Sequence, residues 1–219
     1  MGDYVDLIRH DDKRFNPAEI DPYYKISDLK DLAVKQTDRF YSKIKPIADK
    51  VIVMLYGNHE ESYIKYNGFD PVKYLNKMIP DAKRLGYVGM IKLDVKRNPD
   101  KLSAVYYIDL NHGMGGGGFR EGYAINKVHD LFRWTSGDFR VMGHLHALDT
   151  DWADFREWGG IQRVWYGVSG CFMYKEKEGT RGYFEANAGK PSGIGMLKAM
   201  IKVGRDKRDS RTRLIECLY

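Results

Sequence analysis

The strongest constraint in this sequence is a short apolar run, residues 51–56, that leads into the polar turn Gly57-Asn58-His59-Glu60. A continuous apolar run of this length, rich in β-branched residues, predicts a buried strand. In α/β proteins such strands are usually covered on both faces, and ligand sites lie at their carboxyl ends. Chemistry is therefore expected at this turn, although a strand-end turn without function fits the same four residues.

Length and composition predict a single domain over residues 1–219 with a substantial core, since 43% of the residues are hydrophobic. The longest apolar runs are about six residues, far below a membrane span, and the chain opens without a signal-peptide pattern. Cys171 and Cys217 are far apart in the sequence and form no C-x-x-C motif. We therefore expect a cytoplasmic protein without a disulfide scaffold.

The net charge of +6 is partly concentrated near the end of the chain, in a basic C-terminal segment over residues 204–219 and just before it. Such a segment could contact nucleic acid or another polyanion. A solvated surface explains the same run of charges. Both interpretations stay open.

The order of the predicted elements is that of an α/β chain. Apolar residues at helical spacing predict a first helix, Pro71 marks the start of a later one, and β-rich runs predict the strands. The four glycines at 115–118 form either a mobile loop on the substrate side or a plain connection, and Gly137-Asp138 is interpreted as a turn. We expect helices at 27–45, 60–67, 71–78 and 122–134, and strands at 51–56, 87–95, 103–110, 139–142, 164–168 and 195–203.

Four of the six histidines fall in turns that follow predicted strands: His59, His112, His144 and His146. His10 lies in a charged loop and His129 within a predicted helix, where ordinary surface or packing roles are expected. Mixed nitrogen and oxygen donors suit first-row divalent metals such as Mn, Fe, Ni, Co or Zn better than Ca. Two such ions about 3.5–4 Å apart can clamp a phosphate and activate a bridging water.

The motifs resemble those of the calcineurin-like metallophosphoesterases, in order and in spacing. The start of the chain, Met1-Gly2-Asp3-Tyr4-Val5-Asp6, is similar to the second motif of that family, Gly-Asp-x-x-Asp. The turn at 57–60, His112-Gly113 and Gly143-His144-Leu145-His146 resemble the third, fourth and fifth motifs, and the match is most similar to phage and bacterial members. The resemblance implies an α/β sandwich of two mixed sheets flanked by helices, and hydrolysis of a phosphomonoester or phosphodiester by a metal-bound hydroxide.

The resemblance also implies roles for individual residues. Asp3 would bridge two divalent transition-metal ions (Mn, Fe, Ni or Zn, with Mn favoured). His59 would bind no metal but would stabilise charge on the phosphate and protonate the leaving oxygen. Asp6 and Glu60 would hold neighbouring groups in orientation, although helix capping or solvation explains them equally well. The remaining ligands implied are Asn58, His112 and His144 on one ion and His146 on the other.

One motif of the family is absent: the Asp-x-His of its first strand, so the central N-terminal strands of the sheet are missing from this sequence. One ion would keep four ligands, whereas the other would keep only Asp3 and His146. A start recorded too late, a gene split in two, or degeneration to a single-metal or inactive descendant would each explain this. We expect weak or no activity and at most one well-held ion for the 219 residues. The alternative function is a non-catalytic remnant of the fold, associated with nucleic acid.

The substrate is the least specified part of this prediction. The resemblance covers nucleotides, nucleic acids, phosphoproteins and pyrophosphates, and the basic charge favours a nucleotide or nucleic-acid phosphate ester. The implied site fits phosphomonoesters and phosphodiesters alike.

Overall fold

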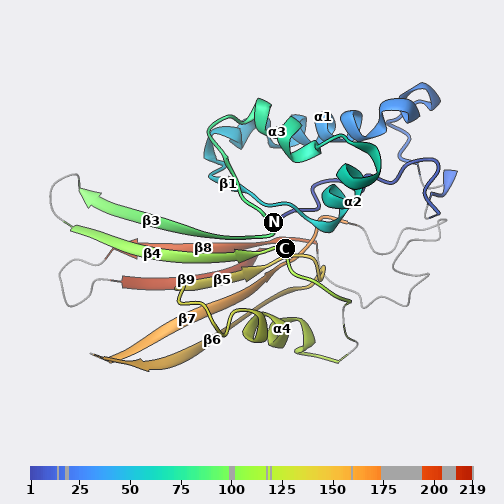
Figure 1. Ribbon diagram of the computed structural model, residues 1–219. Coiled ribbons are helices and arrows are strands. Elements are labelled where there is room, and N and C mark those ends of the chain that lie inside the picture. The colour runs from blue at the N-terminus through green and yellow to red at the C-terminus, as the bar shows by residue number, and fades with distance from the viewer. Residues whose placement is uncertain are drawn as a thin grey trace. The chain divides into compact units, whose positions relative to one another are not determined.

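A computed structural model of the chain describes residues 1–13, 15–17, 20–98, 102–116, 118, 120–158, 160–173, 194–203 and 211–218. These residues belong to two compact units, the first comprising Met1–Tyr87 and the second beginning at Val88 (Figure 1). Within these ranges, no helix is both long enough and apolar enough to cross a membrane. The single domain and the cytoplasmic location remain predictions.

The first unit is mainly helical. Its elements in chain order are η2 (Ile26–Asp31), α1 (Leu32–Ile44), η3 (Lys45–Lys50), β1 (Val53–Met54), α2 (Asn58–Asn67), α3 (Pro71–Met78) and β2 (Lys83–Arg84), where η denotes a 3-10 helix. The two short strands pair in parallel, with Val53 opposite Lys83 and Met54 opposite Arg84.

Three predicted elements of the first unit differ in their bounds, and one of them is the helix expected at 60–67, which begins at Asn58. The helix expected at 27–45 starts as the 3-10 helix η2 and becomes α-helical only at Leu32. The strand expected at 51–56 is a strand only at Val53 and Met54, although Ile52 and Tyr56 also form backbone hydrogen bonds with the segment that contains β2. The apolar run is nevertheless buried at Met54 and Leu55, which are almost fully covered. The core around Met54 contains Val72, Leu75, Ile79 and Ala82.

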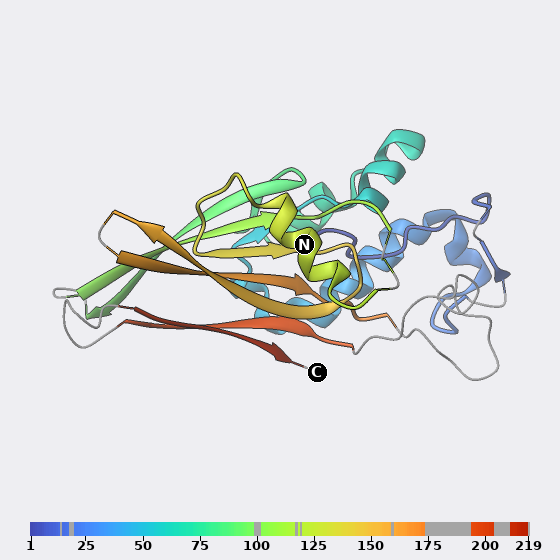
Figure 2. The ribbon, with the colours of Figure 1, turned by 90° about the horizontal axis from the view of Figure 1, so that it is seen from below.

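The second unit is built on a mixed five-stranded sheet in the order β3-β4-β5-β7-β6. The β4-β5 and β5-β7 pairs are parallel, and β3-β4 and β6-β7 are antiparallel. β8 and β9 form a separate antiparallel pair (Figure 2). The elements are β3 (Val88–Asn98), β4 (Leu102–Asn111), α4 (Tyr123–Leu131), β5 (Phe139–Met142), β6 (Leu148–Glu157), β7 (Gly160–Ser169), β8 (Met196–Val203) and β9 (Arg211–Leu218).

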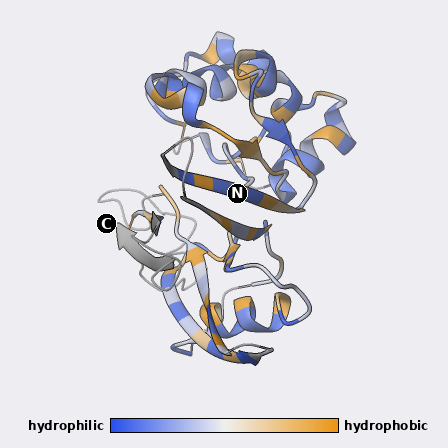
Figure 3. Ribbon diagram, turned by 90° about the vertical axis from the view of Figure 1, so that its left-hand side faces the viewer, coloured by the Kyte–Doolittle hydropathy of each residue, from blue (hydrophilic) through white to orange (hydrophobic). Residues whose placement is uncertain are grey.

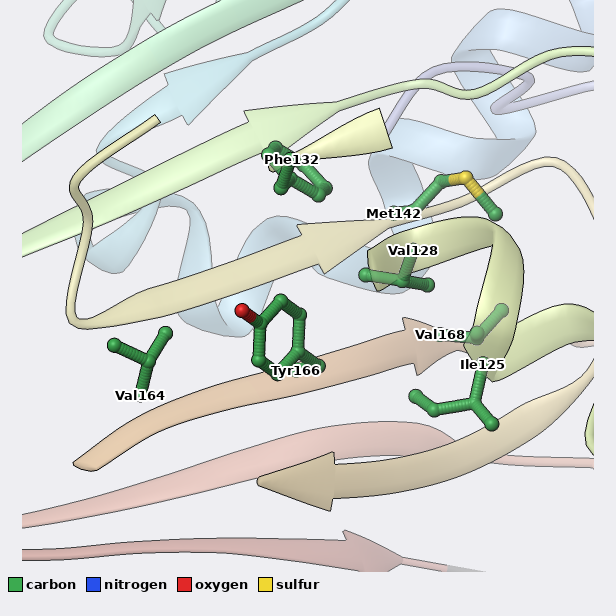
Figure 4. Packing of buried hydrophobic residues seen from close by; sticks show 7 residues of the cluster. All are labelled: Ile125, Val128, Phe132, Met142, Val164, Tyr166 and Val168. Atoms are coloured by element: carbon green, nitrogen blue, oxygen red, sulfur yellow. The ribbon is translucent and has the colours of Figure 1, made fainter. Parts of the chain in front are cut away.

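Both faces of the five-stranded sheet are covered within this unit. On one face, Ile125 and Val128 of α4 pack with Tyr166 and Val168 of β7 (Figure 4). The helix has hydrophobic residues on one part of its surface and hydrophilic residues on the rest, as an amphipathic helix against a sheet requires (Figure 3). On the other face, Leu197 and Ile201 of β8 pack against a cluster that contains Ala104, Tyr106 and Phe139.

The chain is therefore mixed α/β, with sheets flanked by helices, as the sequence predicts. The predicted neighbours at 87–95 and 103–110 are confirmed as the antiparallel pair β3-β4. Three strands were not predicted. They are β2, β6 and β9. The last of these, β9, lies within the basic C-terminal segment 204–219 and pairs with β8 along its length. The rest of that segment lies outside the described residues.

Candidate functional site

In the first unit, the polar turn starts helix α2. Gly57 is the residue before the helix, and Asn58, which is exposed, is its first residue. Gly57 lies directly against Asp3: a Cβ atom at position 57 would lie 2.1 Å from Asp3 Oδ1 and 2.5 Å from the Asp3 backbone nitrogen. A glycine is therefore required here by close approach, not by its backbone angles.

Glu60 is the anchor of this turn, and its side chain is fully buried. Its carboxylate accepts hydrogen bonds from three backbone N–H groups: Asp3 at 2.8 Å, Tyr4 at 2.7 Å and Gly57 at 2.9 Å. The bond from Gly57 caps helix α2, and the other two hold the start of the chain. Burial and the nearby Asp3 carboxylate raise the pKa of Glu60, against the lowering effect of these hydrogen bonds. Glu60 therefore caps the helix and is not solvated, whereas its role in orienting a metal ligand stays a prediction.

Asp3 is fixed from both its backbone and its side chain. It has a positive φ of 52°, which an aspartate tolerates better than most residues. Its Oδ1 accepts a hydrogen bond from the His59 backbone N–H at 3.0 Å. Next to it, the Tyr4 hydroxyl accepts one from the Leu55 N–H at 3.0 Å. The segment that resembles the second motif is therefore bound to the turn that resembles the third.

His59 contacts Asp6 through its ring, with Nδ1 lying 2.8 Å from the Asp6 carbonyl oxygen. A carbonyl oxygen only accepts, so a neutral His59 carries its proton on Nδ1 and its lone pair on Nε2. The carboxylate of Asp6 is exposed. His59 also lines a pocket of ≈ 230 Å³, together with residues that include Arg9, Tyr63 and Tyr66.

In the second unit, His112 follows β4 and is almost fully buried, with 1% of its surface exposed. Asn111 shapes the turn around it, since its Oδ1 accepts a hydrogen bond from the Gly113 N–H at 2.8 Å. Gly113 has φ 94°, and a Cβ atom there would lie 2.8 Å from Met142 Cγ. The Gly143 N–H donates to the Asn111 carbonyl at 3.2 Å, which ties the ends of β4 and β5 together.

His144 and His146 both have positive φ angles, 66° and 53°, on either side of a tight turn in which the Leu145 N–H donates to the Gly143 carbonyl at 2.8 Å. The His144 ring meets the His112 ring edge-on, with centroids 5.1 Å apart and planes at 68°. One ring nitrogen of each lies within 4.8 Å of the other. His144 Nε2 contacts the Gly115 carbonyl oxygen at 2.9 Å.

The structure thus groups the predicted residues into two half-sites, one in each unit. The first half-site is Asp3, Asn58, His59 and Glu60, and the second is His112, His144 and His146. Within the second, the rings of His112 and His144 pair, whereas His146 belongs to no group of three or more metal donors among the described residues. Gly137-Asp138, interpreted from the sequence as a turn, contains a bend at Asp138, and both carboxylate oxygens of Asp138 accept hydrogen bonds within the unit.

Sequence reasoning missed the groups that orient the two histidine rings. The carbonyl oxygens of Asp6 and Gly115 are backbone atoms, which every residue type has, so the sequence does not indicate their role. Asn111 had a signal, because an asparagine two residues before a glycine is typical of a side-chain-supported turn. No sequence signal indicated Lys127 of α4, which donates a hydrogen bond to the loop that carries Gly115.

Comparisons with known proteins add little to this geometry. No family model matches the chain, and no curated protein matches it. Among solved structures, the crystal structure of Chaetomium thermophilum Vps29 is similar over 82% of this chain and 85% of that chain, with 12% sequence identity and a TM-score of 0.30. A likeness this weak supports no statement about function.

Proposed function

We propose that this chain is a metal-dependent phosphoesterase in which His112 and His144 bind the first metal ion. Asp3 and Asn58 are the further ligands that the motif resemblance implies. The observation that carries the proposal is the pairing of the His112 and His144 rings. Two imidazole nitrogens bound to one ion at about 2.1 Å lie no more than about 4.2 Å apart. The separation of at most 4.8 Å is therefore within a small ring movement of a common ion.

The donor types fit this assignment. Imidazole nitrogens with carboxylate and amide oxygens suit a first-row divalent ion, with Mn favoured here and Fe, Ni or Zn as alternatives. When bound, the ion would polarise the phosphoryl oxygens and activate a water for attack. A second ion would have only Asp3 and His146 as ligands from this sequence. We therefore expect one well-held ion and weak activity.

His59 is the proposed proton donor to the leaving oxygen. Its Nδ1 is engaged by the Asp6 carbonyl, which fixes the ring and leaves Nε2 as the nitrogen that can take up and release a proton. The proposed substrate is a phosphate ester, with a nucleotide or nucleic acid favoured by the net charge of +6. The residues lining the pocket beside His59 would contact the leaving group.

Metal content is the direct test. The chain is loaded with Mn²⁺, freed of excess metal and analysed by mass spectrometry, and then assayed with p-nitrophenyl phosphate and bis-p-nitrophenyl phosphate. We expect one ion per chain, slow hydrolysis of at least one substrate, and loss of both in His112→Asn. The matched control is His10→Asn, because His10 is an exposed histidine of the first unit. A wild type that retains no more metal than His112→Asn would refute the proposal.

A second candidate function is a non-catalytic relative that binds a polyanion. The net charge of +6 favours it, because phosphate backbones attract basic chains. It predicts salt-dependent binding of a short single-stranded oligonucleotide, unaffected by His112→Asn, and no hydrolysis at any metal concentration. Filter binding in a salt series, run beside the metal analysis, separates the two functions.

A further inference from the structure

We propose that Lys127 is a positioning residue for His144: it holds the glycine loop whose carbonyl fixes the ring of that ligand. This inference rests on the proposed function, since it assigns how one metal ligand is oriented. Lys127 is half-buried on α4, between core residues of the same helix. The contacts that carry the inference all lie within the second unit.

Lys127 binds the loop on both sides of Gly115. Its ammonium group donates to the Met114 carbonyl oxygen at 3.0 Å and to the Gly116 carbonyl oxygen at 3.5 Å. It also lies 5.3 Å from the centre of the Tyr123 ring, close enough for a cation–π contact. Because Val128, the next residue, is completely buried in the core, the stem of Lys127 starts from a rigid element.

Two glycines of the loop lie so close to Lys127 and Tyr123 that a larger residue would contact these side chains. Gly115 has φ 81°, and a Cβ atom there would lie 2.6 Å from Lys127 Nζ. A Cβ atom at Gly118 would lie 2.4 Å from Tyr123 Cγ. Glycine at these two positions lets α4 side chains approach the backbone closely. The loop that the sequence predicts as a flexible segment is thus held, at its described residues, by α4.

The consequence for His144 follows from the carbonyl between the two Lys127 contacts. The Gly115 oxygen lies 2.9 Å from His144 Nε2 and can only accept, so a neutral ring has its proton on Nε2. The lone pair then lies on Nδ1, which becomes the nitrogen that binds metal. A backbone carbonyl that fixes the tautomer and orientation of a ligating histidine commonly governs metal affinity. Lys127 fixes that carbonyl.

The test compares three variants of the full chain: Lys127→Met, Lys127→Arg and Lys92→Met. Methionine keeps the length of the side chain but removes the donors, whereas arginine retains a cationic donor. Lys92 is exposed on β3, so Lys92→Met matches the loss of one charge without touching the loop. Two readouts are taken: the ¹⁵N chemical shifts of the His144 ring in metal-free protein, which report its tautomer, and Co²⁺ affinity by titration calorimetry.

We expect the His144 ring to be a single Nε2–H tautomer in wild type and in Lys92→Met, a mixture in Lys127→Met, and near wild type in Lys127→Arg. Co²⁺ affinity should fall about tenfold in Lys127→Met, at the lower end of what such supporting contacts contribute. Circular dichroism checks that each variant is folded.

The tautomer of the His144 ring tests the positioning role of Lys127, and Co²⁺ binding by the wild type tests the proposed metal site. An unchanged His144 tautomer in folded Lys127→Met would overturn the role of Lys127, even if wild type binds Co²⁺. If wild type binds no Co²⁺ but the tautomer shifts in Lys127→Met, the positioning role stands and the metal site fails. The two failures are therefore distinguishable.

Discussion

The two half-sites hold their histidines by opposite ring nitrogens. In the first, His59 presents Nδ1 to the carbonyl of Asp6, and in the second, His144 presents Nε2 to the carbonyl of Gly115. Because a carbonyl oxygen only accepts a hydrogen bond, the neutral ring has its lone pair on Nε2 in His59 and on Nδ1 in His144. The same side chain is thus prepared for two different tasks by which of its nitrogens the backbone engages.

The half-sites also differ in how the chain is held around them. The first depends on the buried carboxylate of Glu60, which accepts hydrogen bonds from three backbone N–H groups. The second depends on backbone shape, with positive φ at Gly113, His144 and His146. Removal of the Glu60 carboxylate should therefore damage the first half-site, which also has no room for a Cβ atom at Gly57, and addition of a methyl group at Gly113 should damage the second.

The largest expected effect separates the two histidines. His59→Ala should lower the rate of phosphate-ester hydrolysis by about 10²–10⁴-fold while leaving bound Mn²⁺ unchanged, because a proton donor is lost and no ligand is. His144→Ala should remove both the metal and the hydrolysis. Metal content and rate are measured on the same samples, with the exposed His10→Ala as control. Loss of metal in His59→Ala would contradict the division of roles.

The next effect tests the buried carboxylate. Glu60→Ala removes the acceptor of three N–H groups and should reduce the free energy of unfolding of the first unit by about 4 kcal/mol. Amide hydrogen exchange should accelerate at Asp3, Tyr4 and Gly57 before it does elsewhere in the unit. Glu61→Ala is the matched control, an exposed glutamate of the same helix, with an expected change of about 1 kcal/mol from the lost hydrogen bond of the Tyr87 hydroxyl. Equal exchange rates in the two variants would show that Glu60 is not the anchor.

The sequence predicted those elements that local chemistry determines. α3 begins at Pro71 and keeps helical spacing, so its bounds were found to the residue. β6 was missed because Asp149, Asp151 and Asp154 interrupt its apolar pattern. It is a strand because it pairs with β7, the next strand along the chain, over ten residues, with Trp152 opposite Trp165, and this pairing outweighs its polar local pattern.

The same division holds at the site. The residue types that carry chemistry were identified from the sequence, since histidine at a strand end is conspicuous. What orients them was not: the Asp6 and Gly115 carbonyls are backbone atoms, and Lys127 reaches the loop from another element. Orientation depends on tertiary contacts, and a single sequence does not record them.

A smaller effect tests the backbone shape of the second half-site. Gly113→Ala should destabilise the second unit by about 2 kcal/mol, because it adds both positive-φ strain and a contact with Met142. Gly68→Ala, at φ 70° with open space around its Cβ position, should cost only about 1 kcal/mol from strain. Urea denaturation measures both. If the two variants lose the same stability, the contact with Met142 is not limiting.

The smallest expected effect concerns His129, a histidine whose contacts stabilise the fold and belong to neither half-site. His129 stacks on Tyr166 with ring centroids 3.9 Å apart, and its Nε2 lies 2.9 Å from Asp151 Oδ2. His129→Ala should therefore lower the free energy of unfolding by about 1 kcal/mol, from the lost ring contact and hydrogen bond. Bound metal and hydrolysis should stay at the wild-type level, because the engaged nitrogen faces a carboxylate of the sheet and not a half-site. A loss of metal in this variant would mean that histidine removal perturbs the second unit generally, and metal loss in His144→Ala would then no longer identify a ligand.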